Sequence, residues 1–136
     1  MTTDALRGGK ETGGCMSEAW IGVDLDGTLA KYDGWKGPDH IGEPIPEMVE
    51  RVKEWIRKGQ KVKIMTARVC SKNEHRLHSF MMIQEWSFKL FGTILEITAE
   101  KDYAMIELWD DRAVTVEVNT GRILTTERRD NDTHKL

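Results

Sequence analysis

Runs of apolar residues separated by polar and turn-forming segments predict several short strands. The run Trp20–Leu25 ends in acidic residues and Gly27, a pattern typical of a buried strand that stops at a turn. The segments Lys61–Thr66, Thr93–Thr98 and Ala104–Trp109 have a similar character. We therefore expect four strands spread along the chain.

Two segments between these strands have the periodicity of helices. Over residues 45–58, apolar positions follow the i, i+3, i+4, i+7 pattern, Pro46 suits the first helical turn, and Gly59 suits a left-handed end. A second helix is predicted from the capping-box spacing of Ser71–Glu74 to Gly92. Its apolar residues are Leu77, Phe80, Met81, Ile83 and Phe88.

The remaining segments complete the predicted fold. The Gly-rich stretch from Gly27 to Pro44 has no sustained period and is expected to be a loop. Alternating valines over 114–118, the turn signal 119–121 and the apolar pair 123–124 predict a C-terminal antiparallel strand or hairpin. Strands that alternate with helices imply right-handed crossovers and a mainly parallel sheet covered on both faces. We expect a three-layer, Rossmann-like α/β domain.

Composition limits the classes of protein that fit. The chain has 136 residues, which suits one domain, predicted over 18–126 between a flexible tail at 1–17 and a polar tail at 127–136. The sequence contains no apolar run of membrane-spanning length, and the tail lacks the apolar stretch of a signal peptide. Because Cys15 and Cys70 are too sparse for a disulfide framework, we expect a cytoplasmic protein with no membrane contact.

The ends of the predicted strands carry the candidate chemistry. Asp24 and Asp26 follow the first strand, and Asp110 and Asp111 follow a later one. Because parallel strands bring their carboxyl ends to one rim, the fold would gather four carboxylates there, and their repulsion calls for a cation. All-oxygen ligation with water and phosphate is what Mg²⁺ prefers. The sequence therefore predicts a magnesium site.

Two further residues suit phosphate chemistry at this rim. Thr66 ends the second strand, and its hydroxyl can hydrogen-bond a phosphoryl oxygen during transfer. Lys101 can offset the negative charge on a nucleophile and on phosphate. A carboxylate that attacks phosphorus would divide hydrolysis into two displacements, and a second carboxylic acid would protonate the leaving oxygen.

These residues together resemble a known superfamily. Asp24-Leu25-Asp26-Gly27-Thr28-Leu29 is similar to the first motif of the haloacid dehalogenase superfamily, and Thr66-Ala67-Arg68 resembles its second motif. Lys101 matches its isolated basic residue, and Trp109-Asp110-Asp111 its final acidic motif, in the same order. The resemblance covers roughly two-thirds of the chain.

The resemblance implies a role for each matched position. Asp24 would be the nucleophile, and Asp26 the general acid and base with its backbone carbonyl on Mg²⁺. Asp110 would bind the metal directly or through water, with help from Asp111. Thr66 and Lys101 would complete the catalytic set. The substrate phosphate would contact Gly27, Thr28, Ala67 and Arg68.

Several alternatives stay open from the sequence. Arg68 suits either the substrate phosphate or a salt bridge with a helix end, and Trp35 suits either substrate contact or the edge of the core. The chain lacks room for the cap domain of many relatives, although the loop 27–43 could form a flap. The predicted function is a Mg²⁺-dependent phosphomonoester hydrolase.

The substrate and partners are less defined by the sequence. A formal charge of −3 gives no general attraction to nucleic acid, yet a phosphorylated nucleic-acid end is as compatible as a nucleotide or a sugar phosphate. A homo-oligomer in which a neighbouring subunit covers the site is a further alternative. A mutase or phosphonatase, or a non-catalytic Mg²⁺ and phosphate-binding module, would also fit.

Overall fold

The computed structural model describes residues 18–124 and contains a four-stranded parallel sheet with two helices. The strands are β1 (Trp20–Asp24), β2 (Lys61–Met65), β3 (Glu96–Thr98) and β4 (Met105–Trp109), in the order β3-β2-β1-β4. The predicted α/β class and parallel sheet are confirmed. The two predicted tails fall in segments outside the described residues. No helix within 18–124 is long and apolar enough to cross a membrane.

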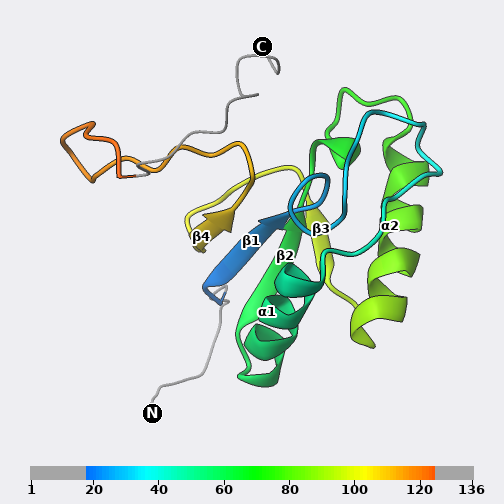
Figure 1. Ribbon diagram of the computed structural model, residues 1–136, viewed down its shortest axis with the longest axis horizontal. Coiled ribbons are helices and arrows are strands. Elements are labelled where there is room, and N and C mark those ends of the chain that lie inside the picture. Colours follow the sequence, from blue (N-terminus) through cyan, green and yellow to red (C-terminus); the bar gives the residue numbers. More distant parts are fainter. Residues whose placement is uncertain (1–17, 125–136) are drawn as a thin grey trace.

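The helices follow β1 and β2 as the periodicity predicts. Helix α1 (Pro46–Arg57) has proline in its first turn and buries Met48, Val49 and Val52. A 3₁₀ turn, η2 (Ala67–Val69), leads toward α2 (Arg76–Phe91), which ends at Gly92 in the left-handed conformation. Both predicted helices are confirmed in type (Figure 1).

The predicted capping box at Ser71–Glu74 is wrong, because α2 begins only at Arg76. The side chain of Asn73 directs the backbone into a turn instead. Its Oδ1 accepts a hydrogen bond from the His75 amide at 3.0 Å, and its Nδ2 donates to the Arg68 carbonyl at 2.5 Å. Such local Asn bonds compete with helix formation, which delays the helix start.

Both helices pack against the same face of the sheet. In register, Val23 of β1 lies beside Ile64 of β2, and Ile64 lies beside Ile97 of β3, so these side chains share a face. They form one core cluster with Val52 of α1 and Ile83 of α2. Two right-handed crossovers in the same direction put both helices on one side. The predicted three-layer arrangement is therefore wrong for the described residues, which form two layers.

The opposite face of the sheet is covered by side chains rather than by a described helix. Trp20 is fully buried there, and its Nε1 donates to Asp102 at 2.9 Å. The Lys63 ammonium lies 4.3 Å from the centre of the Trp20 ring and pairs with Glu96 at 3.1 Å. A lysine with its ion pairs thus shields the tryptophan.

Of the two predicted forms of the C-terminal segment, an antiparallel strand in the sheet is wrong, whereas a short hairpin outside the sheet is present among the described residues. Val116 and Ile123 form an isolated antiparallel bridge, and on either side of it the Glu117 amide donates to the Arg122 carbonyl and the Leu124 amide to the Thr115 carbonyl, both at 2.7 Å. The predicted turn is present, since Asn119 and Gly121 both have positive φ. The segment runs away from the sheet as the orange arm in Figure 1, and its alternating valines stay exposed. Without an apolar surface to pack on, the alternation does not produce a strand.

Candidate active site

The loop after β1 is a tight turn held by its own backbone. The amides of Leu29 and Ala30 donate to the Leu25 carbonyl at 3.0 and 2.9 Å, and the Gly27 amide donates to the Ala30 carbonyl at 2.8 Å. Leu25 and Leu29 are fully buried. These anchors fix the backbone that carries Asp24 and Asp26 at the carboxyl edge of the sheet.

Three carboxylates from two strand ends converge at this edge. Asp24, Asp110 and Asp111 each offer an oxygen atom, and these atoms lie within 4.8 Å of one another. Burial raises the pKa of Asp24 to about 8, with further contributions from the charges of Asp110 and Asp111. The protein by itself therefore holds too little positive charge to keep all three groups ionised at neutral pH.

The donor set fits a hard divalent cation. Oxygen atoms opposite each other around Mg²⁺ are separated by roughly 4.2 Å, twice the metal–oxygen distance, so the three carboxylates need only a small adjustment to share one ion. Neutralising their mutual repulsion would also stabilise the ionised form of Asp24. Asp24, Asp110 and Asp111 could thus hold a metal ion, as predicted; the identity of the ion stays a prediction.

Thr28 and Gly27 join the two acidic loops. The Thr28 hydroxyl accepts a hydrogen bond from the Asp111 amide at 2.9 Å and lies 3.3 and 3.5 Å from carboxylate oxygens of Asp111 and Asp24, to one of which it can donate. Gly27 has φ +94, and a Cβ there would lie 2.7 Å from Asp111 Oδ2. The substrate role predicted for these two residues is untested, and the observed contacts are with the acidic cluster.

Asp26, the predicted acid, is paired with a buried arginine. Arg68 Nε and Nη2 donate to the two oxygens of the Asp26 carboxylate at 2.8 and 2.9 Å. Nη2 also donates to the His40 carbonyl at 2.9 Å, whereas the buried Nη1 has no hydrogen-bond partner among the described residues. Arg68 therefore does not form the salt bridge with a helix end that the sequence suggested, its contact with substrate phosphate stays a prediction, and the two N–H donors of Nη1 have no partner among the described residues.

The loop between Lys31 and Pro44 borders the same region. Ala30 and Pro44 form an antiparallel bridge, and the Lys31 amide donates to the Glu43 carbonyl at 2.8 Å, so the ends of the loop are closed. Trp35 stands near its tip with the Arg68 guanidinium 4.9 Å from the centre of its ring. Trp35 is 54% exposed. Of the two predicted positions for Trp35, the edge of the core is thus excluded.

A cleft of about 880 Å³ collects most of the predicted site residues. Thr66 lines it together with four aspartates and Ala67, and the Thr66 hydroxyl accepts a hydrogen bond from the Arg68 amide at 3.1 Å. Lys101 lies exposed after β3 and does not line the cleft, so its catalytic role stays a prediction. The other lining residues were not predicted as part of the site; they are Tyr32, Met65, Cys70, Asn73, Ala99 and Arg112.

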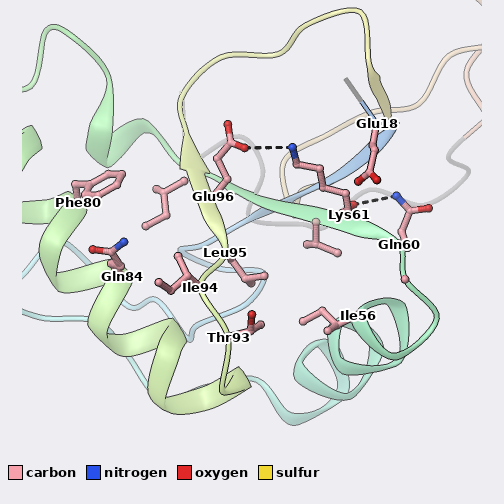
Figure 2. Close-up of a pocket in the computed structure, with 13 residues that line it drawn as sticks. Glu18, Ile56, Gln60, Lys61, Phe80, Gln84, Thr93, Ile94, Leu95 and Glu96 are labelled. Carbon is pink, nitrogen blue, oxygen red and sulfur yellow. Dashed lines mark hydrogen bonds and ion pairs between the residues drawn. The ribbon is translucent and has the colours of Figure 1, made fainter. Parts of the chain in front are cut away.

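A second hollow, of about 620 Å³, lies at the other end of the strands (Figure 2). Ile56 of α1, Phe80 of α2 and Leu95 before β3 line it. Its lysine, Lys61, pairs with Glu96 at 3.5 Å. It contains no acidic cluster, and ligands of parallel sheets bind beyond the carboxyl ends of the strands, so the 880 Å³ cleft is the better candidate.

Comparisons with known proteins do not identify a family for this chain. No family model matches the chain, and no curated protein matches it significantly. Among solved structures, a conserved protein from Bacteroides thetaiotaomicron is 22% identical, with 72% of this chain and 79% of that chain covered and a TM-score of 0.49. This similarity names no family and assigns no activity.

Proposed function

We propose that the protein is a Mg²⁺-dependent phosphomonoester hydrolase related to the haloacid dehalogenase superfamily. The observation that carries the proposal is the convergence of Asp24, Asp110 and Asp111 beside Asp26 and Thr66 in one cleft. Four carboxylates and two guanidinium groups line this cleft, so a phosphate could enter only after a cation has offset the excess negative charge. Mg²⁺ held by Asp24, Asp110 and Asp111 would supply that charge and polarise the phosphoryl group.

The side chains then have distinct roles in two displacements. An Asp24 oxygen attacks phosphorus, the bond to the leaving oxygen breaks, and that oxygen takes a proton from Asp26. Asp26 next accepts a proton from water, which attacks the aspartyl phosphate and releases Asp24 and inorganic phosphate. The Thr66 hydroxyl would hydrogen-bond the transferring group. For these proton transfers, one Asp26 oxygen would leave Arg68 Nη2 while the other keeps its hydrogen bond from Arg68 Nε, so Arg68 continues to orient the carboxyl group.

The pairing of Asp26 with Arg68 also favours a second candidate function. A carboxylate that accepts two hydrogen bonds from a buried guanidinium is not placed to transfer protons. If both hydrogen bonds persist, the cleft would bind Mg²⁺ and phosphate without turnover. The two candidates differ in whether covalent phosphate forms on Asp24.

Rapid acid quench followed by intact-protein mass spectrometry separates these candidates. The experiment uses the full chain, ring-free phosphate esters and a nitrophenyl phosphate, each with Mg²⁺ and with excess chelator. The hydrolase should turn over only with Mg²⁺. Asp24→Asn should lose both turnover and covalent phosphate. Asp26→Asn should accumulate the phosphorylated protein from the activated ester, because hydrolysis of the aspartyl phosphate needs Asp26.

The expected loss of turnover in Asp26→Asn is about 10²- to 10⁴-fold. A phosphorylated Asp24→Asn protein, or full activity in chelator, would refute the proposed mechanism. Mg²⁺-dependent phosphate binding without turnover of any ester would favour the binding module. Transfer of the phosphoryl group to another hydroxyl group of the substrate rather than to water would indicate a mutase.

A further inference from the structure

Two exposed aromatic side chains border the cleft that contains the acidic cluster. Tyr32 and Trp35 both line it and are 47% and 54% exposed. The other four tryptophans belong to the buried or partly buried interior, so Trp35 is the one that the fold leaves available to a ligand. Aromatic rings contribute to stability chiefly by burial, which Trp35 largely forgoes.

Trp35 is nevertheless held in place. One face of its ring meets the Arg68 guanidinium at 4.9 Å, and Arg68 is only 6% exposed because Asp26 and the His40 carbonyl fix it. The loop that carries Trp35 is closed at its base by the Ala30–Pro44 bridge. A ring that is fixed on one side and open on the other is suited to stack a planar ligand group.

This aromatic site lies next to the phosphate chemistry. Arg68 contacts both Trp35 and Asp26, so a single guanidinium separates the ring from the predicted acid. Arg112, which follows the acidic cluster, lines the same cleft and adds a second cation. The volume of about 880 Å³ lies in the usual range for small-molecule sites.

From this arrangement we propose that Trp35, supported by Tyr32, stacks the base of a nucleoside phosphate whose phosphate group lies over Asp24, Asp110 and Asp111. The inference rests on the proposed function, because the phosphate is placed at the proposed catalytic carboxylates. Its chemical class is a phosphate ester that carries a planar nitrogenous base. A free nucleotide and the phosphorylated end of an oligonucleotide share that chemistry.

Binding is measured without turnover through the tryptophan fluorescence of an Asp24→Glu protein with Mg²⁺, and the same titration with Trp35→Phe shows which part of the change comes from Trp35 among the five tryptophans. A nucleoside monophosphate is compared with ribose 5-phosphate, which has the phosphate and sugar but no base. Base stacking on an aromatic side chain should give the nucleotide roughly 5- to 150-fold higher affinity. The nucleotide should quench the emission, since the base would cover the ring.

Variants assign this preference to the ring. In calorimetric titrations, Trp35→Ala should bring the affinity for nucleotide down to that for ribose 5-phosphate, and Trp35→Phe should restore most of the preference. Phe88→Ala is the matched control, because Phe88 is 49% exposed but lines none of the clefts described above. It should keep the full preference for nucleotide.

Equal affinity for nucleotide and ribose 5-phosphate, or a preference that survives in Trp35→Ala, would overturn the inference. Hydrolysis of ring-free esters without any base preference would leave the hydrolase proposal intact while refuting the aromatic site. Nucleotide binding through Trp35 without hydrolysis would support the aromatic site and refute the hydrolase proposal. A phosphorylated oligonucleotide that binds more tightly than the nucleotide, with an affinity that falls as salt rises, would identify a nucleic-acid end as the source.

Discussion

The Arg68 guanidinium forms contacts in three directions. It donates two hydrogen bonds to Asp26 and one to the His40 carbonyl, and it stacks against Trp35. A planar fork with five donors can serve all of these partners at once, whereas a lysine ammonium cannot. The orientation of Asp26 therefore depends on Arg68, which acts as a positioning residue in the proposed hydrolysis.

Arg68→Lys should slow hydrolysis in a way that depends on the leaving group. The variant keeps the positive charge but loses the bidentate hydrogen bonding to Asp26, so the Asp26 carboxyl group is held less well for protonating a poor leaving oxygen. A misplaced catalytic group commonly costs on the order of 10²-fold in rate. We expect a loss of this size for an alkyl phosphate and a much smaller loss in the first displacement for a nitrophenyl phosphate, measured as the pre-steady-state burst.

Arg112→Lys provides the matched control for that experiment, since Arg112 is a cleft cation that forms no hydrogen bond to Asp26 within the described residues 18–124. It should affect both esters alike. Equal losses for the two esters in Arg68→Lys would contradict a positioning role for Arg68.

The sequence identified the residues of the site better than their contacts. The order of Asp24, Thr66 and Asp110 along the chain was sufficient to predict that they meet, because parallel strands place their carboxyl ends together. The Arg68 pairing with Asp26 was not predictable, since the two residues are 42 positions apart and their approach depends on the turn of η2. The position of Lys101 outside the cleft depends likewise on an irregular connection.

At the scale of elements, a close backbone approach closes the loop that carries Trp35. A Cβ on Gly42 would lie 2.0 Å from the Lys31 carbonyl oxygen, so the two ends of the loop can meet only because residue 42 has no side chain. The contact neighbours the hydrogen bond from the Lys31 amide to the Glu43 carbonyl. Loss of Gly42 would thus separate the ends of the loop.

Gly42→Ala should destabilise the protein by about 1 to 3 kcal/mol, the usual cost of overpacking, and should weaken the proposed stacking of nucleotide on Trp35. Urea unfolding measures the first effect and nucleotide quenching the second. Gly34→Ala is the control in the same loop, since its φ is +123 but a Cβ there would have open space. Because Gly42 does not have a positive φ, only the clash with Lys31 acts there, and a Gly42→Ala protein of unchanged stability would contradict the close backbone approach.

One lysine covers the face of the sheet on which no described helix packs. Lys63 is 8% exposed, lies over the Trp20 ring at 4.3 Å, and pairs with Glu96. We expect Lys63→Ala to lower the free energy of unfolding by about 1 to 2 kcal/mol, since it uncovers Trp20 and removes a cation–π contact. Urea denaturation measures the change. Lys53→Ala, whose pair with Glu50 is on the exposed side of α1, should change it by less than about 0.5 kcal/mol.

The sequence was sufficient to predict which segments form helices and strands, but less so to predict which side of each element is buried. Periodicity was sufficient for α1, whose buried residues are apolar at helical spacing. In α2 the buried residues are Ser79, Ile83 and Ser87, whereas Leu77 and Met81 stay exposed. Small serines permit a close approach of α2 to the sheet, and this tertiary constraint overrides the apolar pattern. The alternating valines of 114–118 led to a wrong prediction of a strand for a related reason, because alternation does not show whether the apolar side packs against another element.

At the scale of the whole molecule, the acidic rim links the stability of the fold to pH and metal. Burial and the charges of Asp110 and Asp111 raise the pKa of Asp24 from 3.8 to about 8 in the folded protein. The folded state thus binds this proton more tightly than the unfolded chain. The resulting stabilisation is complete below pH 3.8 and is lost as the pH rises through about 8.

The metal-free protein should therefore lose stability between pH 5.5 and 8.5 relative to an Asp24→Asn variant, which has no proton to lose at that position. Thermal unfolding in chelator across this range measures the difference in Tm between the two proteins. Saturating Mg²⁺ should raise the Tm of the original protein more at pH 8.5 than at pH 5.5, because the metal binds the ionised carboxylates.

Asp33→Asn is the control: a hydrogen bond from Lys36 lowers the pKa of the exposed Asp33, so that group is fully ionised throughout. A Tm difference between the original protein and Asp24→Asn that stays constant with pH would show that Asp24 holds no proton in the folded metal-free protein, and a Mg²⁺ effect that is independent of pH would show that the metal displaces no proton from Asp24.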